Sequence, residues 1–235
     1  MFEYDAALLQ RYPTIRAGAI YAIGLRNGPS PQGLLDLYRS EQEAVVERLA
    51  LTPIAEHPSI AAWRRAFSAF GVKPTQYRNA AEALLRRLGK HGDIPSISVL
   101  VDIGNLVSIR YALPVAFFDQ GQVAGTTTVR FADGSESFTD LGSSATTNPE
   151  PGEVVFVDTA GRVSARRWCW RQSAQSATDP STTKALVTVE GHHDTAADDV
   201  TTALADIAAL LAAYQPAAQL ASAQLSPDAP FFDPS

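Results

Sequence analysis

The order of helical and strand patterns along this 235-residue chain constrains its fold more than any other feature. Apolar residues recur at helical spacing through most of the first half, whereas short apolar runs separated by Gly, Asp and Pro dominate the second half. These patterns predict helices over 31–51, 59–70, 75–88, 97–113 and 194–214, and strands over 14–26, 115–118, 123–131, 136–140, 153–157, 162–173 and 184–190. Helices segregated from strands are typical of an α+β domain. We therefore expect helices of the N-terminal half to pack on a mixed or antiparallel sheet.

The length of the chain is compatible with one domain and a single core. We expect residues 1–58 to add a strand and a helix as a layer of the same domain, and residues 59–214 to form its main body. Residues 215–235 are rich in Ala, Pro, Ser and Gln, which predicts a flexible tail. No apolar run approaches the ~18 residues of a membrane span, and no cationic, apolar start marks a signal peptide. These features predict a cytoplasmic protein without a membrane partner.

Residues that commonly carry metal or nucleophile chemistry are sparse. The only cysteine, Cys169, excludes an internal disulfide, and the chain contains four histidines and no HExxH or glycine-rich phosphate motif. We expect no metal and no cofactor. Because no base is identified near Cys169, we interpret it as a packed small residue. The adjacent His192 and His193 are expected in a surface loop.

The basic residues are concentrated in two stretches, although the formal net charge is −6. Residues 61–92 hold seven basic side chains against one acid, Glu82, and a second basic stretch covers 162–171. Such a stretch is either a solvated helix face or a surface that contacts phosphates. The second interpretation gives six candidate RNA-binding residues: Arg64, Arg65, Arg78, Arg86, Arg87 and Lys90.

Tryptophan and arginine are interleaved over residues 166–173. In a strand, Trp168, Trp170 and Gln172 share one face, and Cys169 and Arg171 share the other. The tryptophans either stack on an unpaired base or lie in the core with arginine toward solvent. A third interpretation places Arg171 or Gln172 at a pocket rim, where it holds the terminal adenosine or a carbonyl of a substrate.

A carboxylate and an amide share one face of the predicted helix 97–113. Asp102 and Asn105 are three residues apart, so both side chains project in nearly the same direction. Together they can hold a hydroxyl or an ammonium group, but they can equally fasten the helix to a neighbouring loop.

The run VDIGNLVSI, followed by LPVAFFD, resembles a motif of the B3/B4 domain in phenylalanyl-tRNA synthetase beta subunits. In that family a VD-x-TN-x-V helix precedes a QP-x-HAFD strand. The similarity continues through residues 129–134, 138–142 and 149–158 and covers roughly residues 60–190. The chain contains no aminoacylation domain, so it resembles a free-standing member of the family. The resemblance implies a B3/B4-like fold for residues 59–214.

The resemblance also implies an editing site that hydrolyses the ester of a wrongly charged tRNA. By position, Asn105 takes the place of a pocket asparagine, and Glu190 falls near a pocket glutamate; these are the candidate catalytic residues. Gly104 and Ala116 stand where the family has threonine and histidine, and both are departures from its pattern, so its specificity is not carried over. The candidate substrate-binding residues are Asp102, Gly104, Ala116, Arg171 and Gln172, with Glu190 or Asp102 binding the ammonium group.

Three functions are compatible with these residues. The first is a trans-acting aminoacyl-tRNA deacylase whose partners are tRNA and its amino-acyl group, and not DNA. Such a reaction needs a positioned water and oxyanion stabilisation, and the ribose hydroxyl of the substrate can help, so no strong nucleophile is required. The second is a non-catalytic tRNA-binding or amino-acid-binding module with the same fold. The third is a hydrolase of another amino-acyl ester or amide.

Overall fold

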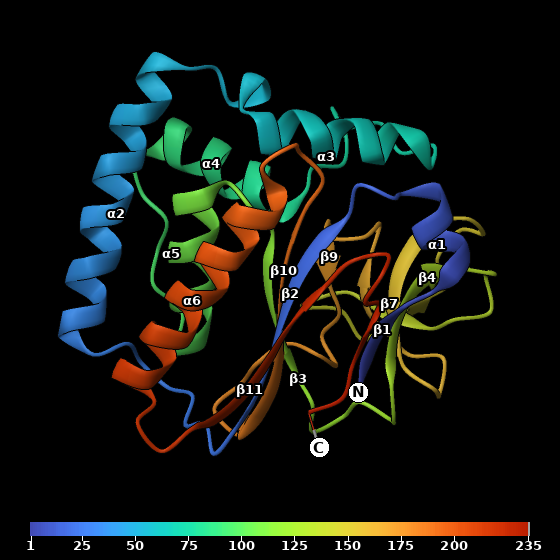
Figure 1. Cartoon of the computed structure of the whole chain (residues 1–235). Coiled ribbons are helices and arrows are strands. Elements are labelled where there is room, and N and C mark those ends of the chain that lie inside the picture. The colour runs from blue at the N-terminus through green and yellow to red at the C-terminus, as the bar shows by residue number, and fades with distance from the viewer. Residues whose placement is uncertain (235) are drawn as a thin grey trace.

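A four-stranded antiparallel sheet lies at the centre of the computed structural model, which describes residues 1–234 (Figure 1). Its strand order is β11–β2–β10–β3, formed by Gln219–Leu225, Arg16–Ile23, Lys184–Gly191 and Val115–Asp119. Successive side chains of a strand point to opposite faces of its sheet. In β10, Val187 and Val189 therefore belong to the core on one face, whereas Leu186 belongs to the core on the other.

A second, six-stranded sheet packs across the far face of the first. Its order is β12–β1–β4–β7–β8–β9, formed by Phe231–Phe232, Phe2–Tyr4, Thr127–Phe131, Val154–Val157, Val163–Arg166 and Arg171–Gln172. Only the β1–β4 pair is parallel within this sheet. A small pair of strands, β5 (Phe138–Thr139) and β6 (Thr146–Thr147), lies beside it.

Helices cover the four-stranded sheet on the side away from the second sheet (Figure 1). They are α2 (Gln32–Leu51), α4 (Ala80–His91), α5 (Val99–Tyr111) and α6 (Ala196–Tyr214). Their apolar faces form the helical core, which includes Leu34, Leu85, Ile103, Leu106 and Ile207. None of the helices in residues 1–234 is both long and apolar enough to cross a membrane.

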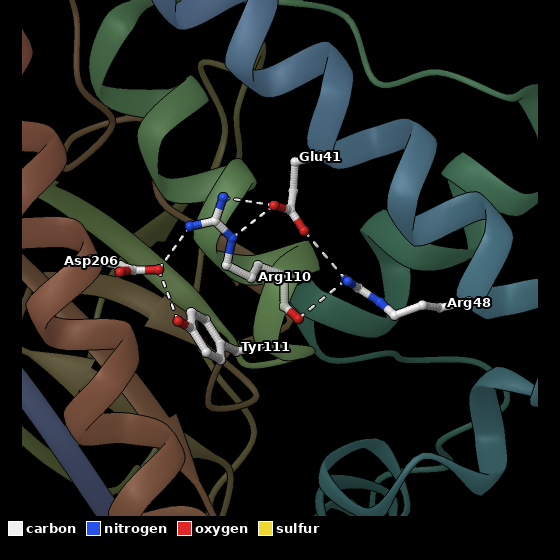
Figure 2. A network of polar contacts seen from close by, with 5 residues as sticks. All are labelled: Glu41, Arg48, Arg110, Tyr111 and Asp206. Carbon is white, nitrogen blue, oxygen red and sulfur yellow. Dashed lines mark hydrogen bonds and ion pairs between the residues drawn. The ribbon is translucent and has the colours of Figure 1, made fainter.

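The helix α5 is the most enclosed of these, because nine of its residues are buried. A polar network fixes its C-terminal end between two neighbours (Figure 2). The Arg110 guanidinium contacts Glu41 on α2 at 2.6 Å and Asp206 on α6 at 2.8 Å. The Tyr111 hydroxyl donates a hydrogen bond to the same Asp206 at 2.8 Å. One arginine thus links three helices, which holds α5 in place against the sheet.

The inter-sheet core fills the space between the two sheets and includes Phe2, Trp63, Phe118, Phe156 and Trp168. The helix α3 (Pro58–Ala69) closes one end of this space, and α1 (Ala6–Arg11) packs beside β4; a short 3₁₀ turn, η1 (Ile54–Glu56), precedes α3. The central sheet therefore separates two cores, one bounded by helices and one bounded by strands.

The predicted α+β class is confirmed, with differences at particular elements. The helix predicted from Thr75 begins at Ala80, because the Asn79 side chain accepts a hydrogen bond from the Glu82 backbone N–H at 2.9 Å and caps the helix there. The short β1 and α1 were not predicted. Each of these elements contains too few residues to display a helical or strand period.

The C-terminal segment predicted as a flexible tail is instead paired. β11 runs antiparallel to β2 from Gln219 to Leu225, and Phe232 of β12 pairs with Phe2. An edge strand obtains its backbone hydrogen bonds from one neighbour and needs little apolar surface of its own. Here Ala221 and Ala223 supply that small surface against the inter-sheet core. Composition alone therefore led to the wrong prediction for this segment.

Candidate functional site

A cavity of about 90 Å³ lies between the two sheets. Its walls come from β3, β7, β8, β10, the residues that follow β8, and the first residue of α4. Phe118, Phe156 and Trp168 supply apolar surface, while Thr188 and Glu190 supply polar groups. A volume of about 10–15 Å³ suffices for one water, so the cavity has room for a small organic group.

Strand alternation places the two polar groups in the cavity. Leu186, Thr188 and Glu190 share the face of β10 that is turned to the inter-sheet core, because they occupy every second position of the strand. The intervening Val187 and Val189 pack against the helices. Alternation along the predicted strand 184–190 therefore determines which β10 side chains can meet a ligand.

Glu190 is the buried acid of the cavity, with a residue exposure of 2%. Its Oε1 accepts hydrogen bonds from the Tyr4 hydroxyl at 2.6 Å and from Trp168 Nε1 at 2.9 Å. Its Oε2 makes no hydrogen bond with the residues that the structure describes. Burial raises the pKa of Glu190 to about 7, although the two donors favour the charged form. The carboxyl group can thus exchange a proton near neutral pH.

The segment Arg167–Trp170 is a turn and not the strand that was predicted over 162–173. Arg167 and Trp168 have positive φ angles of 45° and 61°, which end β8 at Arg166. The turn is held by Glu153, whose carboxylate contacts Arg166 at 2.8 Å and Arg167 at 3.0 Å. Because the alternation is broken, Trp168, Cys169 and Trp170 all line the cavity.

Arg171 and Gln172 lie at the cavity, as one of the interpretations of this segment requires. The Arg171 guanidinium stacks on the Trp170 ring at 4.6 Å and pairs with Asp140 at 2.6 Å. The Gln172 side-chain nitrogen donates to the carbonyl groups of Phe117 and Ser176, each at 2.8 Å. Gln172 is therefore anchored, whereas Arg171 is exposed at the rim.

Ala116 and Cys169 complete the apolar part of the wall. Burial and the neighbouring Glu190 raise the pKa of the Cys169 thiol well above its ordinary value, so the thiol stays protonated. This agrees with its interpretation as a packed small residue. Within residues 1–234, no cluster of three or more His, Cys, Asp or Glu side chains could hold a metal ion.

Asp102 and Asn105 do not line the cavity, because the central sheet lies between it and α5. The buried Asp102 carboxylate accepts hydrogen bonds from Ser30 Oγ at 2.6 Å, from the Ile97 backbone N–H at 2.9 Å and from Ser96 Oγ. Asn105 is half-buried and faces the Tyr38 hydroxyl on α2. The convergence of Asp102, Asn105 and Glu190 that a shared pocket needs is not found. Asp102 instead fastens α5 to neighbouring loops.

Gly104 also faces away from the cavity and allows α5 to approach β3. A Cβ atom at this position would lie 3.2 Å from two ring carbons of Phe117. We therefore expect Gly104→Thr to lower the free energy of unfolding by about 1–3 kcal/mol, because the buried helix would have to move. Urea denaturation measures this change. The control is Gly89→Thr in α4, where the nearest atom would be 3.8 Å away, and an equal loss in both variants would contradict the packing explanation.

His192 and His193 are buried, which corrects their expected surface position. The His192 ring packs against Trp63 at 4.6 Å and Trp168 at 5.0 Å between centroids. His193 Nε2 contacts the Asp199 carboxylate of α6 at 2.7 Å. His192 follows the last residue of β10 directly and packs there with aromatic rings of the inter-sheet core. Sequence reasoning gave weight to the polar residue types and missed these partners.

The six candidate RNA-binding residues divide into two groups. Arg64, Arg78 and Arg86 approach Glu82 Oε1 at 2.7, 3.9 and 2.8 Å, respectively. Arg65, Arg87 and Lys90 are exposed and make no ion pair with the described residues. Three of the cations thus surround one buried acid, and three face solvent.

Sequence reasoning missed Tyr4, which reaches Glu190 from the first strand of the chain. The two residues are 186 positions apart, and no local pattern connects them. The position of Tyr4 depends on the parallel pairing of β1 with β4, which places the strand beside the inter-sheet core.

Comparisons with known proteins add to this description. A family model described as "B3/4 domain" matches residues 62–216. Seventeen chains of solved structures match, and one is an N-terminal fragment of the phenylalanyl-tRNA synthetase beta-subunit from Pyrococcus horikoshii. That match has 12% sequence identity and a TM-score of 0.47, and it covers 94% of this chain and 50% of the fragment. This chain thus spans about half the length of the fragment. No curated protein matches it.

Proposed function

The chain belongs to the B3/4 domain family, and from that premise we propose that it is a trans-acting aminoacyl-tRNA deacylase that hydrolyses the ester of a mischarged tRNA. The family resemblance predicted from the sequence motifs is confirmed by the match over residues 62–216. One observation carries the proposal. The cavity contains a buried acid, Glu190, with one oxygen held by two donors and the other making no hydrogen bond with the described residues.

A desolvated carboxylate is suited to bind the ammonium group of an amino-acyl ester. Glu190 Oε2 is the acceptor in this proposal, while Tyr4 and Trp168 hold the carboxylate in one orientation through Oε1. Hydrolysis then needs a positioned water and stabilisation of the developing oxyanion, for which we assign the Arg171 guanidinium, the cation that lines the cavity and also pairs with Asp140. The neighbouring ribose hydroxyl of the substrate assists, so the proposal requires no protein nucleophile.

The ammonium group is assigned to Glu190 and not to Asp102, because the Asp102 carboxylate is already used by three donors. The catalytic role that the resemblance gives to Asn105 stays a prediction. Its half-buried amide on the far side of the central sheet could act only through the packing of α5.

Deacylation of a panel of mischarged tRNAs tests the proposal. We expect the wild-type protein to hydrolyse at least one of them, and Glu190→Gln to lower kcat/KM about 10- to 100-fold, since hydrogen bonds to charged groups contribute about 1.5–3 kcal/mol. The matched control is Glu150→Gln, an exposed acid outside the cavity. Equal rates for the wild type and Glu190→Gln would overturn the role of Glu190.

An N-acetylated substrate separates ammonium binding from other roles of Glu190. Acetylation removes the positive charge, so it should slow the wild-type enzyme and have little further effect on Glu190→Gln. Binding of charged tRNA without hydrolysis would favour a non-catalytic module. Equally fast hydrolysis of simple amino-acyl esters without tRNA would favour a hydrolase of another ester or amide.

A further inference from the structure

An open groove of about 750 Å³ runs between the C-terminal part of α2, the turn η1 and the helix α4. One wall is cationic and consists of Arg78, Arg86 and Lys90, and the other is apolar and includes Val46, Leu49 and Ile54. No acidic residue lines the groove within the described part of the chain. In a protein with a formal net charge of −6, this segregation creates a local positive field.

The positive charge of this wall is not neutralised by its one internal partner. Glu82 Oε1 is shared by Arg64, Arg78 and Arg86, while the Glu82 side chain is fully buried. Three cations therefore meet one anion. The Arg78 and Arg86 side chains are 41% and 39% exposed, and the buried Arg78 Nε has no hydrogen-bond partner among the described residues. Their remaining N–H donors are available to an external anion.

The groove begins next to the cavity that contains Glu190. Ala80, the first residue of α4, lines the cavity, and Arg78 lines the groove two residues earlier. The backbone N–H of Ala80 donates to the Cys169 carbonyl at 2.9 Å, which ties this end of α4 to the cavity wall. From there the cationic wall follows α4 to Lys90, ten residues beyond Ala80, over about 15 Å at ~1.5 Å per residue. Figure 1 shows α4 next to the upper part of α2, with which it is in contact.

We propose that this groove binds the unpaired 3′ strand of a tRNA whose acylated end enters the cavity. Phosphates lie on Arg78, Arg86 and Lys90, and ribose or base surfaces lie on the apolar wall formed by Val46, Leu49 and Ile54. A cationic track opposite an apolar surface suits single-stranded nucleic acid, whose bases are unstacked and exposed. The identity of the strand rests on the proposed function, whereas the capacity to bind single-stranded RNA does not.

Fluorescence anisotropy with an unacylated 12-nucleotide single-stranded RNA tests the groove. We expect the double variant Arg78→Ala/Lys90→Ala to bind this RNA about 10- to 100-fold more weakly than the wild type. The slope of log affinity against log salt concentration should also become shallower by about one unit or more, because phosphate contacts are lost. The matched control is Arg65→Ala/Arg87→Ala, which removes the same charge from exposed residues outside the groove. Far-UV circular dichroism and thermal unfolding verify that both variants are folded.

Three results would overturn the proposal. They are an equal loss of affinity in the control, tighter binding of a duplex RNA of the same length, and binding of anionic phosphatidylserine vesicles with no binding of RNA. A second variant, Val46→Asp, tests the apolar wall and should also weaken RNA binding, because it places an acid opposite the cations.

Failure of the groove and failure of the proposed function give different results. Hydrolysis of an aminoacyl-adenosine, which is too short to reach the groove, should be unchanged in Arg78→Ala/Lys90→Ala. Hydrolysis of the acylated tRNA should show a raised KM in the same variant. If no acylated substrate is hydrolysed but the expected anisotropy result is obtained, RNA binding by the groove is supported and the deacylase function is rejected.

Discussion

Acidification from pH 7 to pH 4.5 should cost the wild-type protein about 2.5 kcal/mol of unfolding free energy relative to His192→Phe. Burial lowers the pKa of His192 from 6.5 to about 3, with a smaller contribution from His193. The folded state keeps His192 neutral over this range, whereas the unfolded chain takes up a proton. Stability from this group is therefore present above pH 6.5 and is lost as the pH falls.

Phenylalanine suits this test because the position is surrounded by aromatic rings. His192 packs against Trp63, Trp168 and Tyr12, and Thr14 Oγ1 lies 3.3 Å from His192 Nδ1. The variant loses this one polar contact at every pH and keeps the ring packing. Urea denaturation at pH 7, 5.5 and 4.5 gives the difference between the two proteins. His91→Phe at the exposed end of α4 is the control, and a constant difference between wild type and His192→Phe would contradict the prediction.

Titration of Glu190 should change the free energy of unfolding in the opposite direction, and it should do so at higher pH than the titration of His192. Between pH 4.5 and pH 7, the wild type should lose about 3 kcal/mol of unfolding free energy relative to Glu190→Gln. Burial raises the pKa of this carboxyl group from 4.5 to about 7, so the folded state holds a proton that the unfolded chain releases. The stability contributed by the protonated group is present below pH 4.5 and is lost as the pH rises to about 7.

The two groups oppose one another between pH 4.5 and 6.5, so only differences between wild type and variant isolate each effect. Glutamine keeps an oxygen that can accept from Tyr4 and Trp168 and removes the titration. Glu150→Gln, an exposed acid, should follow the wild type at every pH. If Glu190→Gln also follows the wild type, the carboxyl group does not bury its charge, and ammonium binding by a desolvated Glu190 would lose its basis.

The local patterns of the sequence were sufficient for much of the fold. The periods of α2, α3, α5 and α6 were evident, and alternation along 184–190 placed Thr188 and Glu190 on one face of β10. These features depend on side chains a few residues apart, and that spacing is set by backbone geometry. One interpretation of the sequence placed Arg171 or Gln172 at a pocket rim, and both line the cavity from the short strand β9, although a turn at 167–170 interrupts the strand predicted over 162–173.

The site itself depends on contacts that no local pattern encodes. α5 is apolar on nearly every side, so its period could not indicate which face met the sheet and which met α2. The left-handed turn at Arg167 and Trp168 depends on Glu153, and the orientation of Glu190 depends on Tyr4 from the opposite end of the chain.

The sequence by itself determined the long helices, the central strands β2 and β10 and the distribution of charge, because these follow from short-range spacing and composition. Only the tertiary structure decided that Asp102 is used internally, that His192 is buried and that β11 completes the central sheet. The physical reason is that burial and hydrogen bonding are settled between segments far apart in the chain. A polar side chain is committed to structure or left available to a ligand by the partners that folding brings to it.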